Sequence, residues 1–462
     1  MKGHGYHCIT FGCQMNVNDT EWLERSLLRR GWHSAALEEA DAVFVNTCSV
    51  RDKPEQKVYS TLGMIARANP RAVIGVAGCV AQQMGKALAE RCPQVRLVLG
   101  TDGIVNAPQA FEQLLLDEDS RLFYLDFSAS YPDRDPCLDK PDGFILPDLR
   151  SLDHETKPTD SQAFVNIMQG CDNFCAYCIV PYTRGRCKSR PADAVVRECG
   201  QWIERGIRDI TLLGQNVNAY GKDRTSDGTS FAALVRRVAA LEGLERLHVV
   251  SPHPRDFDEE SIALFGELDV LAPRLHLPLQ SGSDAVLKAM GRGYTMERFR
   301  ALTRALTSAR PDMVFSTDLI VGFPGETETD FLHTLDAVRQ IPFAASFSFC
   351  YSDRPGTRAS RMADKIPAEI ASERLQRLQT LQDELSAAYL KTRVGQESRV
   401  LVESKSKKQP DAEAGTVLQG HDQFGSTVNF VADKPVSAGD IVPVVITDAK
   451  KHSLFGIMKS SA

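Results

Sequence analysis

The sequence predicts an α/β protein of three parts: an N-terminal parallel α/β domain, a central partial (β/α)6 barrel and a small C-terminal all-β barrel. Three observations support this prediction. An apolar segment followed by a cysteine and a helical pattern occurs three times near the N-terminus. Six strand-like segments then alternate with amphipathic helical runs, and after one long helix the pattern changes to short alternating segments with glycine-containing turns.

The N-terminal repeats predict strands that end at a common edge. They are Tyr6–Cys13, Ala42–Cys48 and Ala72–Cys79. Ligands of parallel α/β sheets bind at the carboxyl edge of the strands, so Cys13, Cys48 and Cys79 can converge although they are far apart in sequence. Cys8 is an alternative to Cys13, but it lies within the strand rather than in the turn that follows it. We expect this domain to span residues 1–127.

The central part is predicted to follow a linker at 128–160, which is rich in Pro, Asp and Ser, and to span 161–392. Its strand candidates are Phe164–Met168, Asp209–Leu213, Leu247–Val250, Arg274–Leu279, Val314–Val321 and Ala345–Tyr351. Helical runs between them include Asp193–Arg205, Phe231–Leu241, Met296–Ser308 and Glu328–Arg339. Barrel enzymes carry their chemistry just past the strand ends. Six strands would leave a lateral opening for a macromolecular substrate.

The C-terminal part, 393–462, follows a predicted helix from Ala368 to Lys391. Its strand candidates are Ser398–Glu403, Thr427–Val431 and Ile441–Ile446. We interpret this part as a small β-barrel that binds a partner, because none of its residues suggests catalysis.

Cys171, Cys175 and Cys178 form a C-x3-C-x2-C pattern in GCDNFCAYC. Three thiolates on one short loop can bind three irons of a [4Fe–4S] cubane and leave the fourth iron open to a substrate or cofactor. A structural zinc site would need a fourth ligand, usually from a second C-x2-C arm, and no such arm follows. We interpret the N-terminal cysteines as ligands of a second cluster with one open iron; the alternative is three buried structural thiols.

Length, composition and net charge limit which partners and which compartment the sequence predicts. The chain has 462 residues, 43% of them hydrophobic, enough for two or three domains. No segment approaches the apolar length of a membrane span, so we expect no membrane partner. Twelve cysteines without an export signal predict a reducing compartment, the cytoplasm. The net charge of −6 gives no global basic field, so contacts with nucleic acid must be local.

Seven motifs resemble those of the radical SAM (S-adenosylmethionine) methylthiotransferases, and among these the MiaB-type tRNA enzymes. They are GCQMN (12–16), NTCSVR (46–51), AGCVAQ (77–82), GCDNFCAYCIVPYTRGR (170–186), LLGQNVNAYG (212–221), HLPLQSGSD (276–284) and VGFPGET (321–327). The resemblance extends from about His7 to Lys459, nearly the whole chain.

This resemblance implies an N-terminal domain with an auxiliary cluster, a radical SAM partial barrel and an RNA-binding TRAM domain. It implies two [4Fe–4S] clusters and SAM as cofactors and the anticodon stem-loop of tRNA as substrate. We also expect a one-electron donor protein, a sulfur donor of unknown identity and a monomer. In the implied reaction one SAM methylates a sulfur of the auxiliary cluster and another yields a 5′-deoxyadenosyl radical. A methylthio group then joins C2 of N6-isopentenyladenosine, just 3′ of the anticodon.

The resemblance also implies SAM contacts at the strand ends. They are Gln215 and Asn216 near the methionine moiety, Gln280 and Ser281 near the ribose and carboxylate, and Ile320 and Gly322 against the adenine. Tyr177 packs either against the adenine or in the core. The glutamate of the last motif is displaced by one position, to Glu326, which puts its role in doubt. Each of these residues alone is as typical of a turn as of a SAM contact. Only their shared position on one face of the barrel favours a SAM site.

A basic run follows the cysteine loop: Arg184, Arg186, Lys188 and Arg190. It suits RNA phosphates, although a charge run is more commonly a solvated face.

Three rival functions remain open. RimO-like enzymes methylthiolate an aspartate of a ribosomal protein, but they carry a lysine where Met15 stands here. A third group modifies threonylcarbamoyl-adenosine in tRNA, and the same motif argues against it more weakly. The non-enzyme alternative is an iron–sulfur or zinc protein that binds RNA through its β module.

Overall fold

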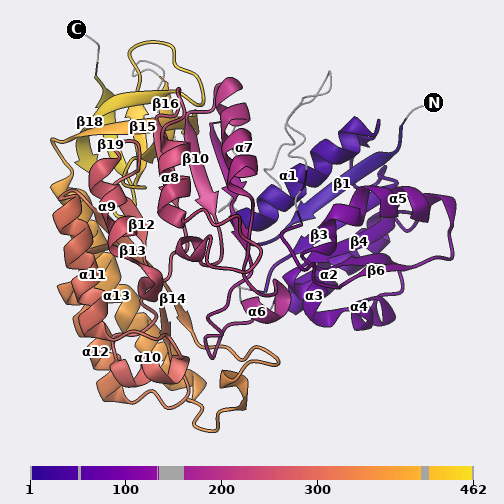
Figure 1. Ribbon diagram of the computed structural model, residues 1–462, viewed down its shortest axis with the longest axis horizontal. Helices are drawn as coiled ribbons and strands as arrows, with labels where there is room; N and C mark the ends of the chain where they lie inside the picture. The colour runs from indigo at the N-terminus through magenta and orange to yellow at the C-terminus, as the bar shows by residue number, and fades with distance from the viewer. Residues whose placement is uncertain (1–2, 50–53, 133, 135–160, 407–415, 460–462) are drawn as a thin grey trace.

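The computed structural model describes residues 3–49, 54–132, 134, 161–406 and 416–459. It confirms the three-part α/β architecture, with the N-terminal part at the right of Figure 1, the central part at the left and the small β-barrel above the central part. The borders at 127, 160 and 392 stay predictions, and positions 135–160 of the expected linker lie outside the described residues. Among the described helices, none is long and apolar enough to cross a membrane.

The N-terminal part is a six-stranded parallel sheet in the order β2-β1-β3-β4-β5-β6. Its strands are β1 Gly5–Thr10, β2 His33–Ser34, β3 Ala42–Thr47, β4 Val73–Gly78, β5 Val95–Leu99 and β6 Leu122–Tyr124. Its helices are α1 Gln14–Arg29, α2 Pro54–Ala68, α3 Cys79–Met84, α4 Lys86–Arg91 and α5 Ala107–Leu116. Because α1 and α5 cover one face and α2, α3 and α4 the other, β3 and β4 are buried throughout.

The central part contains all six predicted strands: β7 Gln162–Asn166, β10 Asp209–Leu213, β11 Arg246–Val249, β12 Arg274–His276, β13 Val314–Val321 and β14 Phe343–Cys350. They form two three-stranded parallel sheets, β11-β10-β7 and β12-β13-β14, which a backbone bridge between Leu247 and Leu271 connects. The cysteine loop lies between the short antiparallel strands β8, Met168–Gln169, and β9, Lys188–Ser189. The partial barrel is therefore divided after β11.

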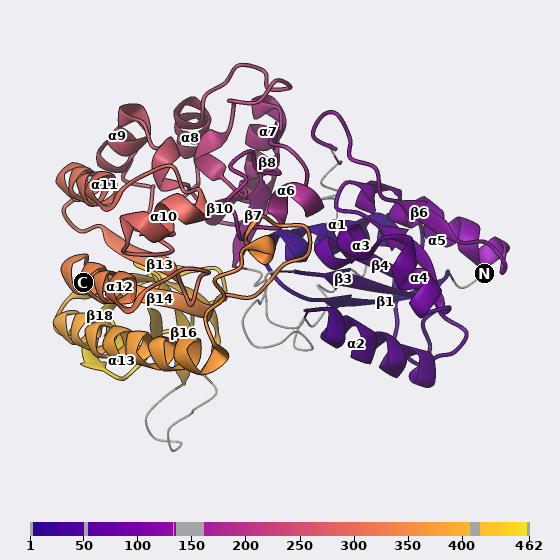
Figure 2. The same cartoon turned by 90° about the horizontal axis from the view of Figure 1, so that it is seen from below.

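Helices cover the outer side of this barrel: α7 Ala192–Glu204, α8 Phe231–Ala239, α9 Glu259–Glu267, α10 Asp284–Met290, α11 Met296–Ala309, α12 Glu328–Gln340 and α13 Ala368–Thr392. The short helix α6 Val180–Thr183 follows the cysteine loop. Ser230, Thr295 and Thr327 cap α8, α11 and α12 through their hydroxyls, so these helices begin at the predicted residues. Figure 2 shows α13 along the outer side of β14, where the two elements pack.

The C-terminal part is a closed barrel in the order β15-β16-β17-β19-β18. Its strands are β15 Glu397–Lys405, β16 Val417–Asp422, β17 Thr427–Val431, β18 Ile441–Ala449 and β19 Leu454–Met458. It packs on the amino ends of the central strands, where Arg246 Nη2 donates a hydrogen bond to the Arg399 carbonyl at 2.6 Å and the Arg399 guanidinium pairs with Glu245 at 2.7 Å. The β-barrel thus contacts the end of the central part opposite the carboxyl edge.

Candidate active site

The cysteines of the N-terminal triad (Cys13, Cys48 and Cys79) follow three neighbouring strands at one edge of the sheet. Cys13 precedes α1, Cys48 follows β3 and Cys79 begins α3. The Cys13 and Cys48 thiols hydrogen-bond each other, and both Cys13 and Cys79 face the Arg184 guanidinium. The rival Cys8 lies within β1 and hydrogen-bonds Glu24 instead. The fold therefore groups the three predicted cysteines.

Glycines allow the backbone beside these cysteines to approach its neighbours closely. Gly12 and Gly78 precede Cys13 and Cys79 and have φ of +112° and +91°, and Gly170 precedes Cys171 with a φ of +82°. These values favour glycine, because an L side chain is strained there. A Cβ on Gly12 would lie 2.2 Å from Cys48 Cβ and 2.7 Å from its sulfur. The backbone before Cys13 can thus lie against Cys48 only because no side chain is present.

Asn16 joins the turns that carry Cys13 and Cys48. Its fully buried side chain donates from Nδ2 to the Phe11 carbonyl at 2.8 Å and to the Thr47 carbonyl at 2.9 Å. Its Oδ1 accepts from Arg184 Nη2 at 2.8 Å and, more weakly, from the Cys13 thiol at 3.6 Å. One amide therefore fixes two strand ends and one arginine, a role that the sequence alone did not indicate.

Charge and hydrogen bonding make Cys13 acidic. The hydrogen bond with Cys48 and, to a smaller extent, the Arg184 charge and backbone N–H groups together lower the pKa of Cys13 to about 6 against the effect of burial. The thiolate is the form of cysteine that binds metal, so this thiol suits a ligand at neutral pH.

The loop triad, defined as Cys171, Cys175 and Cys178, lies in a turn of strained backbone. The Cys171 N–H donates to the Gly185 carbonyl at 3.2 Å, and the Cys178 N–H donates to the Cys175 carbonyl at 3.0 Å. Phe174 has a φ of +46°, which is uncommon for a residue with a side chain. Burial raises the pKa of Cys171 to about 11 and that of Cys178 to about 12.

Arg292 contacts the loop triad, although no motif in the sequence pointed to it. Its buried guanidinium donates from Nη1 toward the Cys175 sulfur at 3.5 Å and the Tyr177 hydroxyl at 3.4 Å. Its Nη2 donates to the Pro278 carbonyl at 2.9 Å. The residue stands between two glycines of positive φ after α10, and this Gly-Arg-Gly turn is the only sequence signal for it. Each triad therefore has one buried arginine.

The donor sets suit clusters better than single ions. Among the described residues, no three Cys, His, Asp or Glu side chains converge closely enough to hold one metal ion. In a cubane each thiolate binds a different iron, so its ligands lie farther apart. Three thiolates make such a cluster anionic, and a buried arginine beside each triad offsets that charge. The residues present therefore fit iron–sulfur groups.

Two contacts join the triads across the interface between the N-terminal and central parts, where α6 packs on α3 (Figure 1). Arg184, at the end of α6, reaches Asn16. Gln215 accepts from the Gly170 N–H at 2.5 Å through Oε1 and donates from Nε2 to the Met15 sulfur. The GCQMN motif thus contacts the central part through both Met15 and Asn16.

The other predicted SAM residues lie at the same end of the barrel, but their contacts and backbone conformations differ. Asn216 donates from Nδ2 to Asp256 at 2.7 Å, and its buried Oδ1 has no hydrogen-bond partner among the described residues. Gln280 has a φ of +72° and pairs by backbone with β13. Strain of this kind in a non-glycine residue is typical of ligand sites.

Two of those residues have local structural contacts. The Ser281 hydroxyl lies 3.4 Å from Thr334 Oγ1 on α12 and accepts the Ser283 N–H at 3.2 Å. The Gly322 N–H donates to Glu326 Oε2 at 2.7 Å, and Arg374 holds the same carboxylate at 2.8 Å. Glu326, whose role was doubtful, thus fixes the turn after β13. Tyr177 and Ile320 pack on one small apolar cluster.

The inner face of β12, β13 and β14 is partly open. Strand alternation directs Phe315, Leu319 and Val321 into the core, and it places Ile320 and Asp318 on the other face. Register puts Phe347 beside Asp318 and Phe349 beside Ile320 on that face. These two rings are 58% and 47% exposed, and His276 pairs with Asp318 at 3.2 Å beside the Phe347 ring. This set (His276, Asp318, Ile320, Phe347 and Phe349) is called the inner-face residues below.

Three of the four residues of the basic run, for which contact with RNA phosphates was predicted, are buried in the protein. Arg184, Lys188 and Arg190 are 3%, 4% and 5% exposed. Lys188 pairs with Asp102 and Arg190 with Glu198. They are buried because β9 and the turn after α6 run through the interface with the N-terminal part. Only Arg186 is exposed; it pairs with Asp172 at 2.8 Å and lies over the Phe174 ring.

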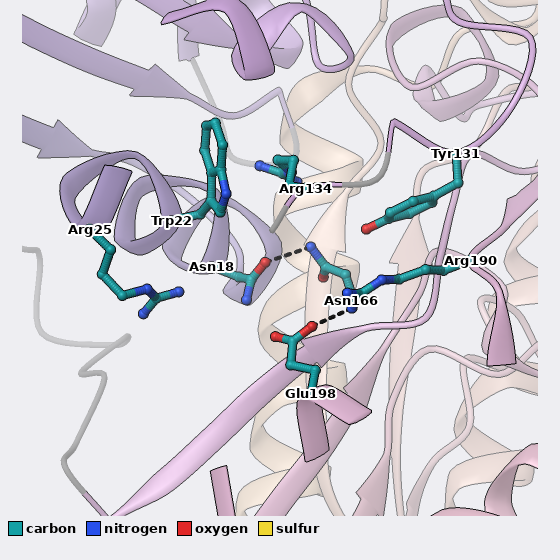
Figure 3. A pocket seen from close by; sticks show the side chains of 8 residues that line it. All are labelled: Asn18, Trp22, Arg25, Tyr131, Arg134, Asn166, Arg190 and Glu198. Carbon is teal, nitrogen blue, oxygen red and sulfur yellow. Dashed lines mark hydrogen bonds and ion pairs between the residues drawn. The ribbon is translucent and has the colours of Figure 1, made fainter. Parts of the chain in front are cut away.

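A small polar pocket lies at this interface, between α1 and the central strands (Figure 3). It is lined by Asn18, Trp22, Arg25, Tyr131, Arg134, Asn166, Arg190 and Glu198. Asn166 Nδ2 donates to Asn18 Oδ1 at 2.8 Å across it. The two parts are thus joined by specific polar contacts, which fix their orientation.

Family models match three stretches of the chain. They are the uncharacterized protein family UPF0004 at residues 5–100, the Radical SAM superfamily at 165–338 and the TRAM domain at 391–459. The chain is 53% identical over 458 residues to the tRNA-2-methylthio-N(6)-dimethylallyladenosine synthase of Nitratidesulfovibrio vulgaris, with 98% of each chain covered. Proteins of the same name from Lawsonia intracellularis and Pseudomonas aeruginosa are 50% and 40% identical, again over 98% of each chain.

Solved structures of similar fold share much less sequence. The radical S-adenosylmethionine methyltransferase TsrM from Kitasatospora setae, with cobalamin and a [4Fe-4S] cluster bound, matches with a TM-score of 0.56 and 16% identity over 78% of this chain and 74% of that one. The cobalamin-dependent radical enzyme OxsB matches with a TM-score of 0.52 and 12% identity over 82% and 56%. At such identities the likeness shows the fold alone.

Proposed function

Because the chain belongs to the family of tRNA-2-methylthio-N(6)-dimethylallyladenosine synthases, we propose that it transfers a methylthio group to C2 of N6-isopentenyladenosine next to the anticodon of tRNA. It is an enzyme of the radical SAM superfamily, whose members use a [4Fe–4S] cluster and SAM. The names of its relatives favour this substrate over a ribosomal aspartate or threonylcarbamoyl-adenosine.

The observation that carries the proposal is the pair of cysteine triads held at one interface. The loop triad would hold the cluster that binds SAM, and the N-terminal triad would hold a second [4Fe–4S] cluster. When bound, these groups supply one-electron cleavage of SAM and a sulfur for transfer. The chain itself holds the triads together through Arg184, Asn16 and Gln215.

SAM would lie at the carboxyl ends of the central strands. Asn216 offers its buried unpaired Oδ1 to an ammonium group, and the strained Gln280 directs its side chain from the end of β12. Ile320 and Tyr177 supply an apolar surface for a purine ring. Arg292 positions Cys175, while Ser281 and Gly322 shape the strand ends.

The target base would lie against the inner-face residues, because exposed aromatic rings stack on bases that are turned out of an RNA strand. Phe347 and Phe349 offer two such rings and an apolar surface for the isopentenyl chain. His276 and Asp318 offer hydrogen-bonding groups beside them.

The anticodon loop would contact a surface beside the loop triad. Phe174 and Tyr182 are 39% and 47% exposed and meet edge to face, and Arg186 lies over Phe174. Rings and a guanidinium together suit a single-stranded loop with its phosphates. The TRAM domain would hold another part of the tRNA. A one-electron donor protein is a further expected partner, and a monomer suffices because one chain supplies both triads.

An anaerobic assay tests this function. Reconstituted full-length protein, SAM and a reductant are incubated with anticodon stem-loop RNA that carries isopentenyladenosine, and the nucleosides are analysed by mass spectrometry. We expect 2-methylthio-isopentenyladenosine, and none of the corresponding product from RNA with plain adenosine or threonylcarbamoyl-adenosine. Methylthiolation of either control RNA in preference would refute the substrate assignment.

A further inference from the structure

Arg184 belongs to the central part, but its side chain lies in the N-terminal cysteine site. It directly follows α6, and its side chain is 4% exposed. Its Nη2 donates to Asn16 Oδ1 at 2.8 Å, and the guanidinium lies 3.9 Å from Asp19 Oδ2. It also hydrogen-bonds Cys79 and interacts with the charge of Cys13. The positive group nearest these thiols thus comes from the other part of the molecule.

The backbone around Arg184 contacts both sides of the interface as well. The Gly185 carbonyl accepts the N–H of Cys171 at 3.2 Å. The Thr183 carbonyl accepts from Thr101 Oγ1 of the N-terminal part at 2.9 Å. Three consecutive residues therefore connect the loop triad, the N-terminal part and the N-terminal triad. The position of Arg184 depends on the fold of both cysteine sites.

We propose that Arg184 is a positioning residue of the N-terminal triad, through which the radical SAM part sets the charge of that site and its orientation toward the loop triad. The inference rests on the proposed two-cluster function. Nothing in the sequence alone distinguishes Arg184 from its basic neighbours, whose partners are carboxylates rather than thiols.

A buried cation shifts the reduction potential of a nearby iron–sulfur cluster in a known direction. The net charge and hydrogen bonds around an iron–sulfur cluster set its reduction potential, and a positive group favours the form with the added electron. A guanidinium also fixes several partners at once, because its donors form a rigid planar fork that lysine lacks. Loss of Arg184 should therefore lower the potential, and replacement by lysine should preserve charge but loosen geometry.

Arg134 provides a matched control. Its Nη2 pairs with the same carboxylate, Asp19, at 2.7 Å, and its side chain is 7% exposed. It lines the polar pocket rather than the cysteine site. Removal of either arginine thus deletes one buried positive charge beside Asp19, but only Arg184 touches the thiols.

The test uses the full chain with Cys171, Cys175 and Cys178 replaced by alanine, so that only the N-terminal triad can hold a cluster. The potential is measured by EPR-monitored redox titration after anaerobic reconstitution. We expect Arg184→Gln to shift the potential to a more negative value, Arg184→Lys to lie near the parent and Arg134→Gln to match the parent. Equal potentials for Arg184→Gln and Arg134→Gln, with the cluster intact, would overturn the inference.

A second measurement separates positioning from simple destabilisation. With all six cysteines present, Arg184→Gln should keep SAM cleavage but reduce methylthio product about tenfold or more, the factor expected for one lost charge-assisted hydrogen bond. Arg134→Gln should keep both reactions. If Arg184→Gln reduced both reactions in proportion to a fall in melting temperature, the role would be structural and the inference wrong. If the triple-alanine parent bound no iron, the two-cluster function itself would fail.

Discussion

At the scale of single residues, Gly12 sets how closely the turn of Cys13 approaches Cys48. We expect Gly12→Ala to displace Cys48, because the added Cβ would lie 2.2 Å from Cys48 Cβ at a φ of +112°. Iron should fall from about eight to about four per chain, since one of two four-iron clusters is lost. Iron and sulfide analysis of anaerobically reconstituted protein measures this.

Gly31→Ala is the control for Gly12→Ala. Its φ of +81° imposes a similar backbone strain, but no atom lies within 4 Å of the added Cβ. It should keep the full iron content. Equal iron loss in both variants would mean that strain rather than the contact with Cys48 is responsible.

Arg186 is the one member of the basic run that is available to RNA. Arg186→Gln should weaken binding of the anticodon stem-loop and reduce the slope of log affinity against log salt by about one, the expectation for one lost phosphate contact. Fluorescence anisotropy at several salt concentrations measures both effects. Arg339→Gln is the matched control, since Arg339 is 54% exposed and pairs with Asp336 on α12, away from the cysteine loop. An unchanged slope for Arg186→Gln would contradict the proposed surface.

Residue types and strand ends were enough to predict the grouping of the N-terminal cysteines, because parallel strands end at one edge. The burial of the basic run could not be predicted in this way. Arg184 and Lys188 look alike in sequence, and only the packing of the N-terminal part on α6 and β9 buries them. Arg292 was missed because an arginine between two glycines indicates a turn and not what the turn faces.

At the scale of elements, β14 combines a buried start with an exposed inner face. Phe347→Ala and Phe349→Ala should raise the KM for the stem-loop RNA while SAM cleavage and the melting temperature change little, because the two rings are 58% and 47% exposed. Phe343→Ala on the same strand, 2% exposed, should instead destabilise the fold by about 3–5 kcal/mol. Kinetics and thermal unfolding of the three variants distinguish these effects. A KM that neither the Phe347→Ala nor the Phe349→Ala substitution changes would refute the base-binding role.

Element prediction succeeded where burial leaves a long apolar signature. All six central strands were found, although only some keep that signature: β10 is buried throughout, whereas β13 and β14 alternate buried with more exposed residues. In the C-terminal barrel β16 and β19 were missed, because glycine and polar residues interrupt VLQGHD and a glycine interrupts the short LFGIM. Their pairing is set by closure of the barrel, which no local pattern reveals.

At the scale of the whole molecule, His248 gives the folded chain a dependence on pH near the C-terminal barrel. Burial and the Arg274 charge lower the pKa of His248 from 6.5 to about 4, and Asp209 offsets this only in part. Between those values the unfolded chain binds the extra proton, so folding stability is lost as pH falls from about 6.5 toward 4. The loss has an upper limit of about 3 kcal/mol.

His248→Gln cannot take up this proton, so its stability should fall less than that of the wild type over the same range. Denaturant unfolding of both proteins at pH 7.5 and pH 5 measures the difference, because titrating groups that do not contact His248 contribute equally to both proteins. Parallel pH profiles for the two proteins would show that His248 is not the group responsible.

The central claim is that each of the two cysteine triads holds a cluster, and a metal count on three full-length proteins tests it most directly. After anaerobic reconstitution the wild type should contain about eight irons with matching sulfide, and alanine replacement of either complete triad should leave about four. Mössbauer spectra should show [4Fe–4S] clusters in each. Four irons in the wild type, all lost with one triad and unaffected by the other, would contradict the account.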